Sequence, residues 1–331
     1  MSTIYFNVPG SPGGGGPSVF VYKTAQALAK RGHKVSYNKP NRANVALCII
    51  ETGRTFKQIN RQKTRVVLRI DGIYCKEYWH GGEDRKWRPD MTALHSKLIS
   101  DIPAVDHMVY QSQWSKDRID DEIVKRDKDY SIIHNGVDVQ LFKPLAGMQS
   151  DIIRLFHIGK MRNGYIMESL IGTYQELKRR GHKVVLTIAG NMDSECAKIY
   201  ASHKSDPFIQ HLGGCSNTAA VKAFSHGDIY LGPRMGSSCD NVIVEALACG
   251  LPVVVPKWGG NSELITDGQE GIVVDSGGHW NYGQDYITKL ADGVEKIIPD
   301  LKDFRKRARH LAVKELTIDK MVDKYLKAMG I

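Results

Sequence analysis

No apolar run in this sequence is long enough to cross a lipid bilayer. The longest runs, such as "VVLTIAG" at 184–190 and "LPVVVP" at 251–256, fall far short of the roughly 20 residues that a membrane-spanning helix needs. The first residues, "MSTIYFNVPG", resemble a strand and lack the basic stretch and apolar core of a secretory signal. These absences predict a cytoplasmic protein without a transmembrane helix.

Cysteine and histidine are present without metal-binding spacing. The six cysteines form no CxxC pair and the twelve histidines no HxxxH pair, so we expect reduced thiols, no bound metal and no cofactor. Asp127–Asp129 spells DKD, but it lies in the charge-alternating stretch "EIVKRDKDYS". We predict a solvated turn there rather than a metal site.

The two familiar glycine-rich nucleotide motifs are also missing. The stretch "NVPGSPGGGGPSVF" is neither a GxGxxG fingerprint nor a Walker loop. A flexible loop is therefore one reading of it. A phosphate cradle is the other, because glycine lets the backbone approach a ligand and a helix start offers free N–H groups. The cradle would be formed by Gly13, Gly14, Gly15 and Gly16.

Positive charge is present in excess and is unevenly placed. Residues 1–145 carry 23 Lys and Arg against 15 Asp and Glu, an excess of +8, and the remaining residues carry 23 against 21, an excess of +2. A basic N-terminal half favours anionic partners such as a phosphorylated substrate, a membrane face or nucleic acid. A basic surface that is merely solvated explains any single cluster equally well.

The pentapeptide "RGHKV" occurs twice, at Arg31–Val35 and Arg180–Val184. Each copy describes a helix that turns, through a glycine with positive φ, into a strand. Strand-like runs alternate with helical patterns around both copies, which predicts doubly wound parallel sheets. A chain of 331 residues accommodates two such domains.

We therefore predict two Rossmann-like domains that face one another across a cleft. The N-terminal domain would span 1–148 and the C-terminal domain 149–312, with the boundary in the segment "LFKPLAGMQSD". Residues 313–331 would form a helix that crosses back to the first domain. The carboxyl ends of both sheets would form the walls of the cleft, where ligands bind in this fold class.

Two carboxylates are candidate functional groups. Glu245 lies in a predicted helix, Asn241–Cys249, whose same-face neighbours carry no charge, so it is better explained as an acceptor for ligand hydroxyls than as a solubilising residue. Asp71 ends the run "RVVLRID", where the sheet edge would meet the cleft. An ordinary Asp-Gly turn is an equal explanation for Asp71, and His80 is a weaker candidate of the same kind.

Several motifs together resemble the retaining glycosyltransferases of family 4, which have the GT-B fold. They are "RIDGIY", "VYQSQW", "IIHNGVDVQLFKP", "FHIGK", "LTIAG" and, most specifically, "CDNVIVEALACGLPVVVPKWGGNSELITDGQEGIVV". The resemblance implies that Glu245 holds the ribose of a sugar nucleotide. It also implies a donor-binding set that includes the glycine loop, Gly190, Leu212, Gly213, Ser237, Ser238, Cys239, Asp240, Asn241 and Val242.

The sequence departs from the family pattern at two places. The family usually has two glutamates eight positions apart, but position 237 is a serine, and the nearby Asp240 and Asn241 are candidates to take over the sugar contact. The family's two diphosphate-binding cations correspond to Lys160 and Arg162 in "GKMRNGY", in a shortened loop. Two cations beside a diphosphate would stabilise the charge that grows on the leaving group.

The resemblance implies a metal-independent glycosyltransferase that retains the configuration of the donor sugar. Its partners would be a nucleotide-diphosphate sugar and a glycan, lipid-linked or other hydroxyl acceptor that is anionic or membrane-associated. Lys160, Arg162, Glu245 and Asp71 would be the catalytic residues. A sugar-nucleotide epimerase of similar fold is one alternative. A basic nucleic-acid-binding protein, which fits the charge but not the cleft motifs, is the other. No aromatic and basic recognition module is visible, so no nucleic acid is expected.

Overall fold

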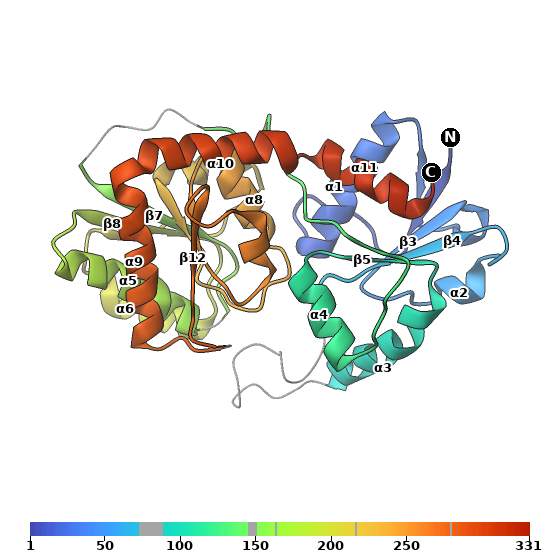
Figure 1. Cartoon of the computed structure of the whole chain (residues 1–331), viewed down its shortest axis with the longest axis horizontal. Helices are drawn as coiled ribbons and strands as arrows, with labels where there is room; N and C mark the ends of the chain where they lie inside the picture. Colours follow the sequence, from blue (N-terminus) through green and yellow to red (C-terminus); the bar gives the residue numbers. More distant parts are fainter. Residues whose placement is uncertain (73–88, 145–150, 163, 216, 279) are drawn as a thin grey trace. The chain divides into compact units, whose positions relative to one another are not determined.

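A computed structural model describes residues 1–72, 89–144, 151–162, 164–215, 217–278 and 280–331 (Figure 1). The chain divides into two compact units, Met1–Gly136 with Leu316–Ile331, and Val137–Glu315. Each contains a six-stranded sheet whose paired strands run parallel, with helices on both faces. The prediction of two doubly wound parallel sheets is therefore confirmed, and each unit is described by itself.

The first unit has the sheet order β2-β1-β3-β4-β5-β6. Its strands are β1 (Thr3–Phe6), β2 (Lys34–Ser36), β3 (Val45–Ile49), β4 (Arg65–Arg69), β5 (His107–Tyr110) and β6 (Tyr130–Ile132). Its helices are α1 (Gly16–Lys30), α2 (Thr55–Gln58), α3 (Pro89–Ala104), α4 (Gln113–Glu122) and α11 (Ile318–Met329).

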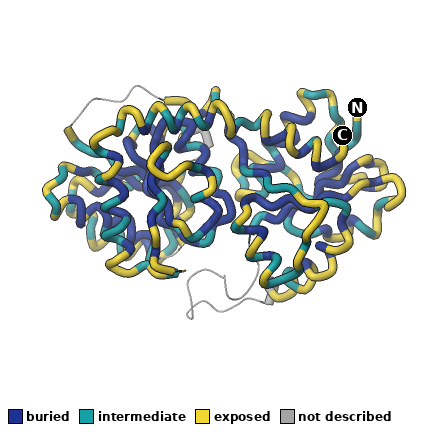
Figure 2. The backbone as a smooth tube through the Cα atoms, viewed as in Figure 1, coloured by how far each residue is buried: buried dark blue, intermediate teal, exposed yellow. Residues whose placement is uncertain are grey.

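The strands of the first sheet are buried on both faces because helices cover both. Along β3, Val45 and Leu47 pack with residues of α1 and α11, whereas Ala46 and Cys48 pack with residues of α3 and α4. This alternation follows from the two-residue period of a strand. The near-continuous apolar run "VALCI" is thus the pattern of a parallel strand inside a layered domain, and Figure 2 shows these strands as buried.

The second unit has the sheet order β12-β11-β10-β7-β8-β9. Its strands are β7 (Ile153–Ile158), β8 (Val184–Ala189), β9 (Ile209–His211), β10 (Ile229–Leu231), β11 (Val253–Pro256) and β12 (Gly271–Val274). Its helices are α5 (Gly164–Arg179), α6 (Ser194–His203), α7 (Asn217–Ala223), α8 (Asn241–Ala248), α9 (Gln284–Ile297) and α10 (Leu301–Glu315).

Helices α5 and α9 lie side by side on one face of the second sheet (Figure 1). Leu155 and Leu231 point to that face and share a core with Leu170 of α5 and Leu290 of α9. The neighbouring strand residue Phe156 belongs to the other face. Helices α8 and α10 pack against one another.

The two "RGHKV" copies occupy equivalent corners, one after α1 and the other after α5. Gly32 has φ +81° and Gly181 has φ +91°, which confirms the predicted left-handed turns. The arginine of each copy also makes an equivalent contact. Arg31 lies 3.0 and 3.2 Å from two carboxylates of α11, and Arg180 lies 2.7 and 2.6 Å from two carboxylates of α9. In both units this arginine therefore ties two neighbouring helices together.

The two arginines are expected to differ in their contribution to stability. Arg180→Ala should lower the free energy of unfolding by about 1–2 kcal/mol, because Arg180 joins a network of three carboxylates that includes the largely buried Glu176. Arg31→Ala should cost less than about 1 kcal/mol, since its partners are 80% and 59% exposed. Urea unfolding of the two variants measures the difference, and equal losses would contradict this explanation.

The units divide at Gly136/Val137 and at Glu315/Leu316, whereas the sequence placed the boundaries at 148/149 and 312/313. The first difference has a packing cause. Phe142 packs edge-on against Phe224 of the second unit, with ring centroids 5.9 Å apart. Arg309 of α10 also donates hydrogen bonds to the carbonyl oxygens of Val139 and Phe142, both at 2.9 Å. The segment after Gly136 therefore belongs to the second unit.

Candidate functional site

The topology of the second sheet indicates where a ligand can bind. The chain runs from β7 outward through β8 and β9, then returns to place β10 on the other side of β7. Ligands of doubly wound sheets bind outside the carboxyl ends of the strands at such a switch point. The segments that follow β7 and β10, residues 159–162 and 232–240, therefore form the candidate site of this unit.

Glycine is required at the edge formed by β7, β8 and β9. Gly190 follows β8 with φ +112°, and a Cβ there would lie 2.0 Å from the carbonyl oxygen of Gly159. The Gly190 N–H donates to the carbonyl oxygen of Gly213 at 2.7 Å. The structure thus brings the predicted Gly190 and Gly213 to the edge that carries Gly159, while the predicted Leu212 is 38% exposed beside them.

Lys160 and Arg162 are exposed on either side of Met161, which is buried. The N–H of Met161 donates to the carbonyl oxygen of Asn191 at 2.9 Å, which fixes the extended segment. Alternate residues of an extended chain project to the same side. The two cationic side chains are therefore expected to project to the same side from the end of β7.

The loop before α8 holds the predicted donor-binding residues. Ser237, Ser238 and Cys239 are buried, and the Oγ of Ser237 has no hydrogen-bond partner among the described residues. The next three residues, Asp240, Asn241 and Val242, are half-buried at the start of the helix. Glu245 lies one turn further on and is also half-buried.

Asp240 is held by a residue from another loop. Its backbone N–H donates to Oδ1 of Asn261 at 2.8 Å, and Nδ2 of Asn261 donates to Oδ2 of Asp240 at 2.9 Å. Nη1 of Arg234 lies 3.8 Å from Oδ1 of the same carboxylate. These three residues bring the ends of β10 and β11 and the start of α8 together. Sequence reasoning missed Arg234 and Asn261.

A buried histidine lies beneath this cluster. Nδ1 of His157 is 2.8 Å from the carbonyl oxygen of Leu231. Because a carbonyl can only accept, Nδ1 carries the proton. Burial lowers the pKa of His157, so the ring is neutral at neutral pH and Nε2 is an acceptor. The charge of Asp240 raises this pKa and that of Arg234 lowers it, but burial is the larger effect. A histidine inside the apolar strand "IRLFHI" was the signal available in the sequence.

Tyr230 links the same groups. Its ring stacks on His157 with centroids 5.6 Å apart, and its hydroxyl donates to the carbonyl oxygen of Ile158 at 3.1 Å. Burial raises the pKa of the Tyr230 hydroxyl far above its ordinary value, and the carboxylates of Asp240 and Glu245 raise it further. Glu245 and Asp240 therefore both influence the pKa of one side chain of β10, a strand that borders the switch point.

The glycine loop of the first unit connects β1 with α1. Its turn is fixed by Ser11, whose carbonyl accepts from the Gly14 N–H at 3.3 Å, and by Ser18, whose hydroxyl donates to the carbonyl of Pro9 at 2.9 Å. A Cβ at Gly13 or Gly16 would meet no described atom within 4 Å. Packing inside the chain therefore does not demand glycine at these two positions, which leaves space for an approaching group.

Asp71 lies inside a closed ring of polar side chains. It forms an ion pair with Arg69, and the two side chains are 3% and 2% exposed. Arg69 donates to Oδ1 of Asn135 at 2.9 Å, Asn135 donates to Oε1 of Gln111 at 3.1 Å, and Gln111 donates to Oδ1 of Asp71 at 3.2 Å. The ring joins the ends of β4, β5 and β6. His80 lies outside the described residues.

The first sheet has its own switch point, between β1 and β3, and an open pocket of ≈ 630 Å³ lies there. Ile50 follows β3 with φ +72°, a strained conformation for a β-branched residue. The strained loop is held by Asn7, which donates to the carbonyl of Glu51 at 2.6 Å, and by Thr52, whose hydroxyl and N–H donate to Asp101. The polar residues lining the pocket include Asn7, Glu51, Thr52, Arg54, Gln58 and Lys97.

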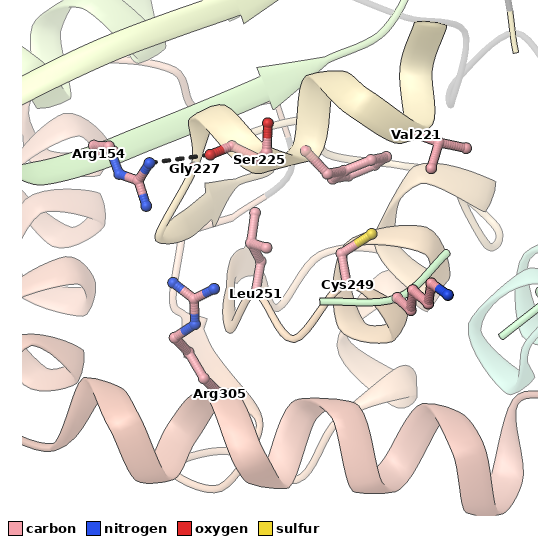
Figure 3. A pocket seen from close by; sticks show the side chains of 9 residues that line it. Arg154, Val221, Ser225, Gly227, Cys249, Leu251 and Arg305 are labelled. Atoms are coloured by element: carbon pink, nitrogen blue, oxygen red, sulfur yellow. Dashed lines mark hydrogen bonds between the residues drawn. The ribbon is translucent and has the colours of Figure 1, made fainter. Parts of the chain in front are cut away.

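The second unit also has a small pocket at the opposite, amino edge of its sheet (Figure 3). Arg154 and Arg305 line it, and both guanidinium groups pair with Asp228, at 2.7 and 2.8 Å. Because β7 and β10 begin at this edge, the pocket is separate from the switch point. Its two arginines are thus paired with the same carboxylate.

Among the residues that the structure describes, no group of three or more His, Cys, Asp and Glu side chains is arranged to hold a metal ion. None of the described helices combines the length and the apolar character that crossing a membrane requires.

Comparison with known proteins identifies similar sequences. Residues 153–300 match the model of the family described as glycosyl transferases group 1. A D-inositol 3-phosphate glycosyltransferase of Paenarthrobacter aurescens is 25% identical over 215 residues, which cover 60% of this chain and 50% of that protein. The chain spans about half the length of the curated relatives that it matches first.

Solved structures resemble the whole chain. Sucrose-phosphate synthase of Thermosynechococcus elongatus has a TM-score of 0.79 at 14% identity and covers 98% of this chain and 97% of its own. HepE of Anabaena, solved with UDP and glucose, has a TM-score of 0.73 at 14% identity, with coverage of 100% and 99%. At this identity the likeness concerns the fold. The predicted GT-B fold class is thereby confirmed, and the sequence similarity to group 1 glycosyl transferases covers residues 153–300.

Proposed function

We propose that this protein transfers a sugar from a nucleotide-diphosphate sugar to an acceptor hydroxyl, with retention of configuration and without a metal ion. The observation that carries the proposal is the coincidence of two independent features. The residues that match group 1 glycosyl transferases, 153–300, contain the switch point between β7 and β10. The segments that follow these two strands hold two exposed cations, Lys160 and Arg162, and two half-buried carboxylates, Asp240 and Glu245.

The donor would bind to the second unit. Glu245 accepts hydrogen bonds from the ribose hydroxyls, because a half-buried carboxylate is a strong acceptor. The backbone of Ser238–Val242 receives hydroxyls of the transferred sugar at the start of α8. Lys160 and Arg162 bind the diphosphate from the end of β7. HepE, which has the same fold, was solved with UDP and glucose, and this supports a nucleotide donor.

The acceptor would bind to the first unit. The open pocket between β1 and β3 offers hydroxyl-binding side chains and a cation, Arg54, at its rim. The excess of +8 over residues 1–145 favours an anionic or membrane-associated acceptor. The name of the similar D-inositol 3-phosphate glycosyltransferase contains a phosphorylated polyol, and this supports an anionic acceptor. Asp71 acts on the acceptor side through the ring that fixes the ends of β4, β5 and β6. The protein would work in the cytoplasm.

The reaction would be a displacement on one face of the sugar. The bond between the anomeric carbon and the diphosphate oxygen breaks while the acceptor oxygen attacks from the same side. The acceptor proton passes to an oxygen of the departing diphosphate. Lys160 and Arg162 stabilise the charge on that diphosphate.

The proposal is tested by incubating the protein with a panel of UDP- and GDP-sugars, with and without phosphorylated polyol acceptors. We expect release of one nucleoside diphosphate together with a new glycosidic product whose anomeric configuration, read by NMR, matches that of the donor. Release of an epimerised sugar nucleotide would instead support the epimerase alternative. A product of inverted configuration would overturn retention.

Turnover is expected to persist within about twofold in excess EDTA, because two fixed cations can neutralise the diphosphate in place of Mg²⁺ or Mn²⁺. The assay compares initial rates before and after chelation. Complete loss of activity on chelation, with recovery on adding one metal, would contradict the assignment of Lys160 and Arg162.

A further inference from the structure

We propose that Asp240 selects the donor by binding hydroxyls of the transferred sugar, and that Asn261 is the positioning residue that holds Asp240 for this task. The inference rests on the proposed function, because it concerns the same switch point. Position 237 is a serine in this chain, and Asp240 was already a candidate for the sugar contact; the inference adds the positioning role of Asn261 and the selection among sugars.

The contacts of Asn261 fix the orientation of the carboxylate. Asn261 is 2% exposed, so its amide is held by packing as well as by its bonds. Its Oδ1 must face Asp240, because it accepts from the Asp240 backbone N–H at 2.8 Å. Its Nδ2 then donates to Oδ2 of the same residue at 2.9 Å. Asn261 therefore grips Asp240 at two points, which restricts its side-chain rotation.

A second contact makes this arrangement rigid. The N–H of Gly260, which precedes Asn261, donates to the carbonyl oxygen of Ser237 at 2.7 Å. The loop after β11 is thus bound to the loop after β10 at two successive places, Gly260 with Ser237 and Asn261 with Asp240. The buried Ser237 Oγ, which lacks a partner among the described residues, lies in the same loop.

The other carboxylate oxygen remains able to accept. Oδ1 of Asp240 lies 3.8 Å from Nη1 of Arg234, which is longer than a hydrogen bond. The Asp240 side chain is 26% exposed and that of Arg234 is 42% exposed. A stabilising role alone does not explain the pairing of Asp240 with Arg234, because ion pairs that are partly in solvent and lack hydrogen-bond geometry contribute little to stability.

A carboxylate beside a guanidinium matches the chemistry of a polyol. Each sugar hydroxyl both donates and accepts, so neighbouring hydroxyls can donate to Asp240 and accept from Arg234. A site built to hydrogen-bond a hydroxyl also rejects analogues in which that hydroxyl is missing or points elsewhere, because its own polar groups would stay unpaired. Asp240 would therefore discriminate between epimeric sugars rather than between nucleotides.

The test measures binding by calorimetry to UDP, to GDP and to six compounds that form three epimeric pairs: UDP-glucose and UDP-galactose, UDP-N-acetylglucosamine and UDP-N-acetylgalactosamine, and GDP-mannose and GDP-glucose. We expect the wild-type protein to bind one sugar nucleotide with clear preference over its epimers. Asp240→Asn and Asn261→Ala should each weaken the binding of that sugar nucleotide about 10- to 100-fold and reduce the preference for it over its epimer. The dissociation constant for the matching nucleoside diphosphate should stay within about twofold.

Asp303→Asn is the matched control, because it removes a carboxylate from α10 that pairs with Lys306. The isosteric Asp240→Asn variant decides the Asp240 assignment even if Asn261→Ala fails to fold. Unchanged epimer preference in Asp240→Asn, or equal losses for sugar nucleotide and nucleoside diphosphate, would overturn the inference while leaving the proposed function intact. A wild-type protein that binds none of the six compounds would overturn both.

Discussion

Replacing Lys160 and Arg162 together by alanine is expected to lower kcat about a hundred- to ten-thousand-fold. Both side chains are exposed and follow β7, on either side of the buried Met161, so they can meet the diphosphate as its charge grows. Removing one group that stabilises such a charge costs about 10²–10³ in rate, and two that share the task cost more. Each single substitution should have a smaller effect, and the larger one identifies the main contact.

The matched control is Lys183→Ala, an exposed lysine just before β8, at the opposite edge of the same sheet. This control should leave kcat unchanged, and all variants should melt like the wild type because none of these side chains is buried. Initial rates at saturating donor give kcat directly. A double variant with normal kcat would remove both residues from the mechanism.

The substitution Glu245→Gln is expected to weaken nucleoside diphosphate binding about 10- to 100-fold. Glutamine keeps the shape and the helical propensity of the residue, but a neutral amide accepts hydroxyl hydrogen bonds less strongly than a carboxylate. A hydrogen bond to a charged group contributes about 1.5–3 kcal/mol, which corresponds to this range. Calorimetric titration with UDP and GDP measures the change.

Glu315→Gln, at the exposed end of α10, is the control for removal of a glutamate charge. It should leave the dissociation constant unchanged. The Glu245 variant must first show the wild-type melting temperature, because Glu245 is half-buried in α8. An unchanged affinity in a folded Glu245→Gln protein would mean that the carboxylate does not hold the ribose.

The fold was predictable from local patterns wherever chain neighbours determine the structure. The two glycines of "RGHKV" turn where expected, and the apolar runs form the predicted parallel strands. Helix α1 begins at Gly16, inside the glycine-rich stretch. Pro17 fits the first turn of a helix, where no N–H bond is lost. The unit boundary was placed differently because it depends on the contact of Phe142 with Arg309, a residue 167 positions further along the chain.

Candidate site residues could be predicted where they lie together in one stretch of the sequence. Lys160, Arg162 and the stretch from Ser237 to Glu245 follow strands at the edge that topology selects. Asn261 was not predictable, because its role depends on a loop that pairing of β10 with β11 brings to Asp240. The burial of Asp71 was hidden for the same reason: the ring of side chains around it includes Gln111 and Asn135, which follow two other strands.

Hydrogen exchange in the presence and absence of a nucleoside diphosphate tests the central claim most directly. We expect the backbone amides of the segments that follow β7 and β10, residues 159–162 and 232–245, to exchange more slowly when saturating UDP or GDP is added. Exchange at the amino edge of the same sheet, residues 225–228 and 249–251, should not change, since those residues lie by the separate pocket of Figure 3. Protection confined to the amino edge, or protection in neither place by either nucleotide, would contradict a nucleotide-sugar site at the switch point.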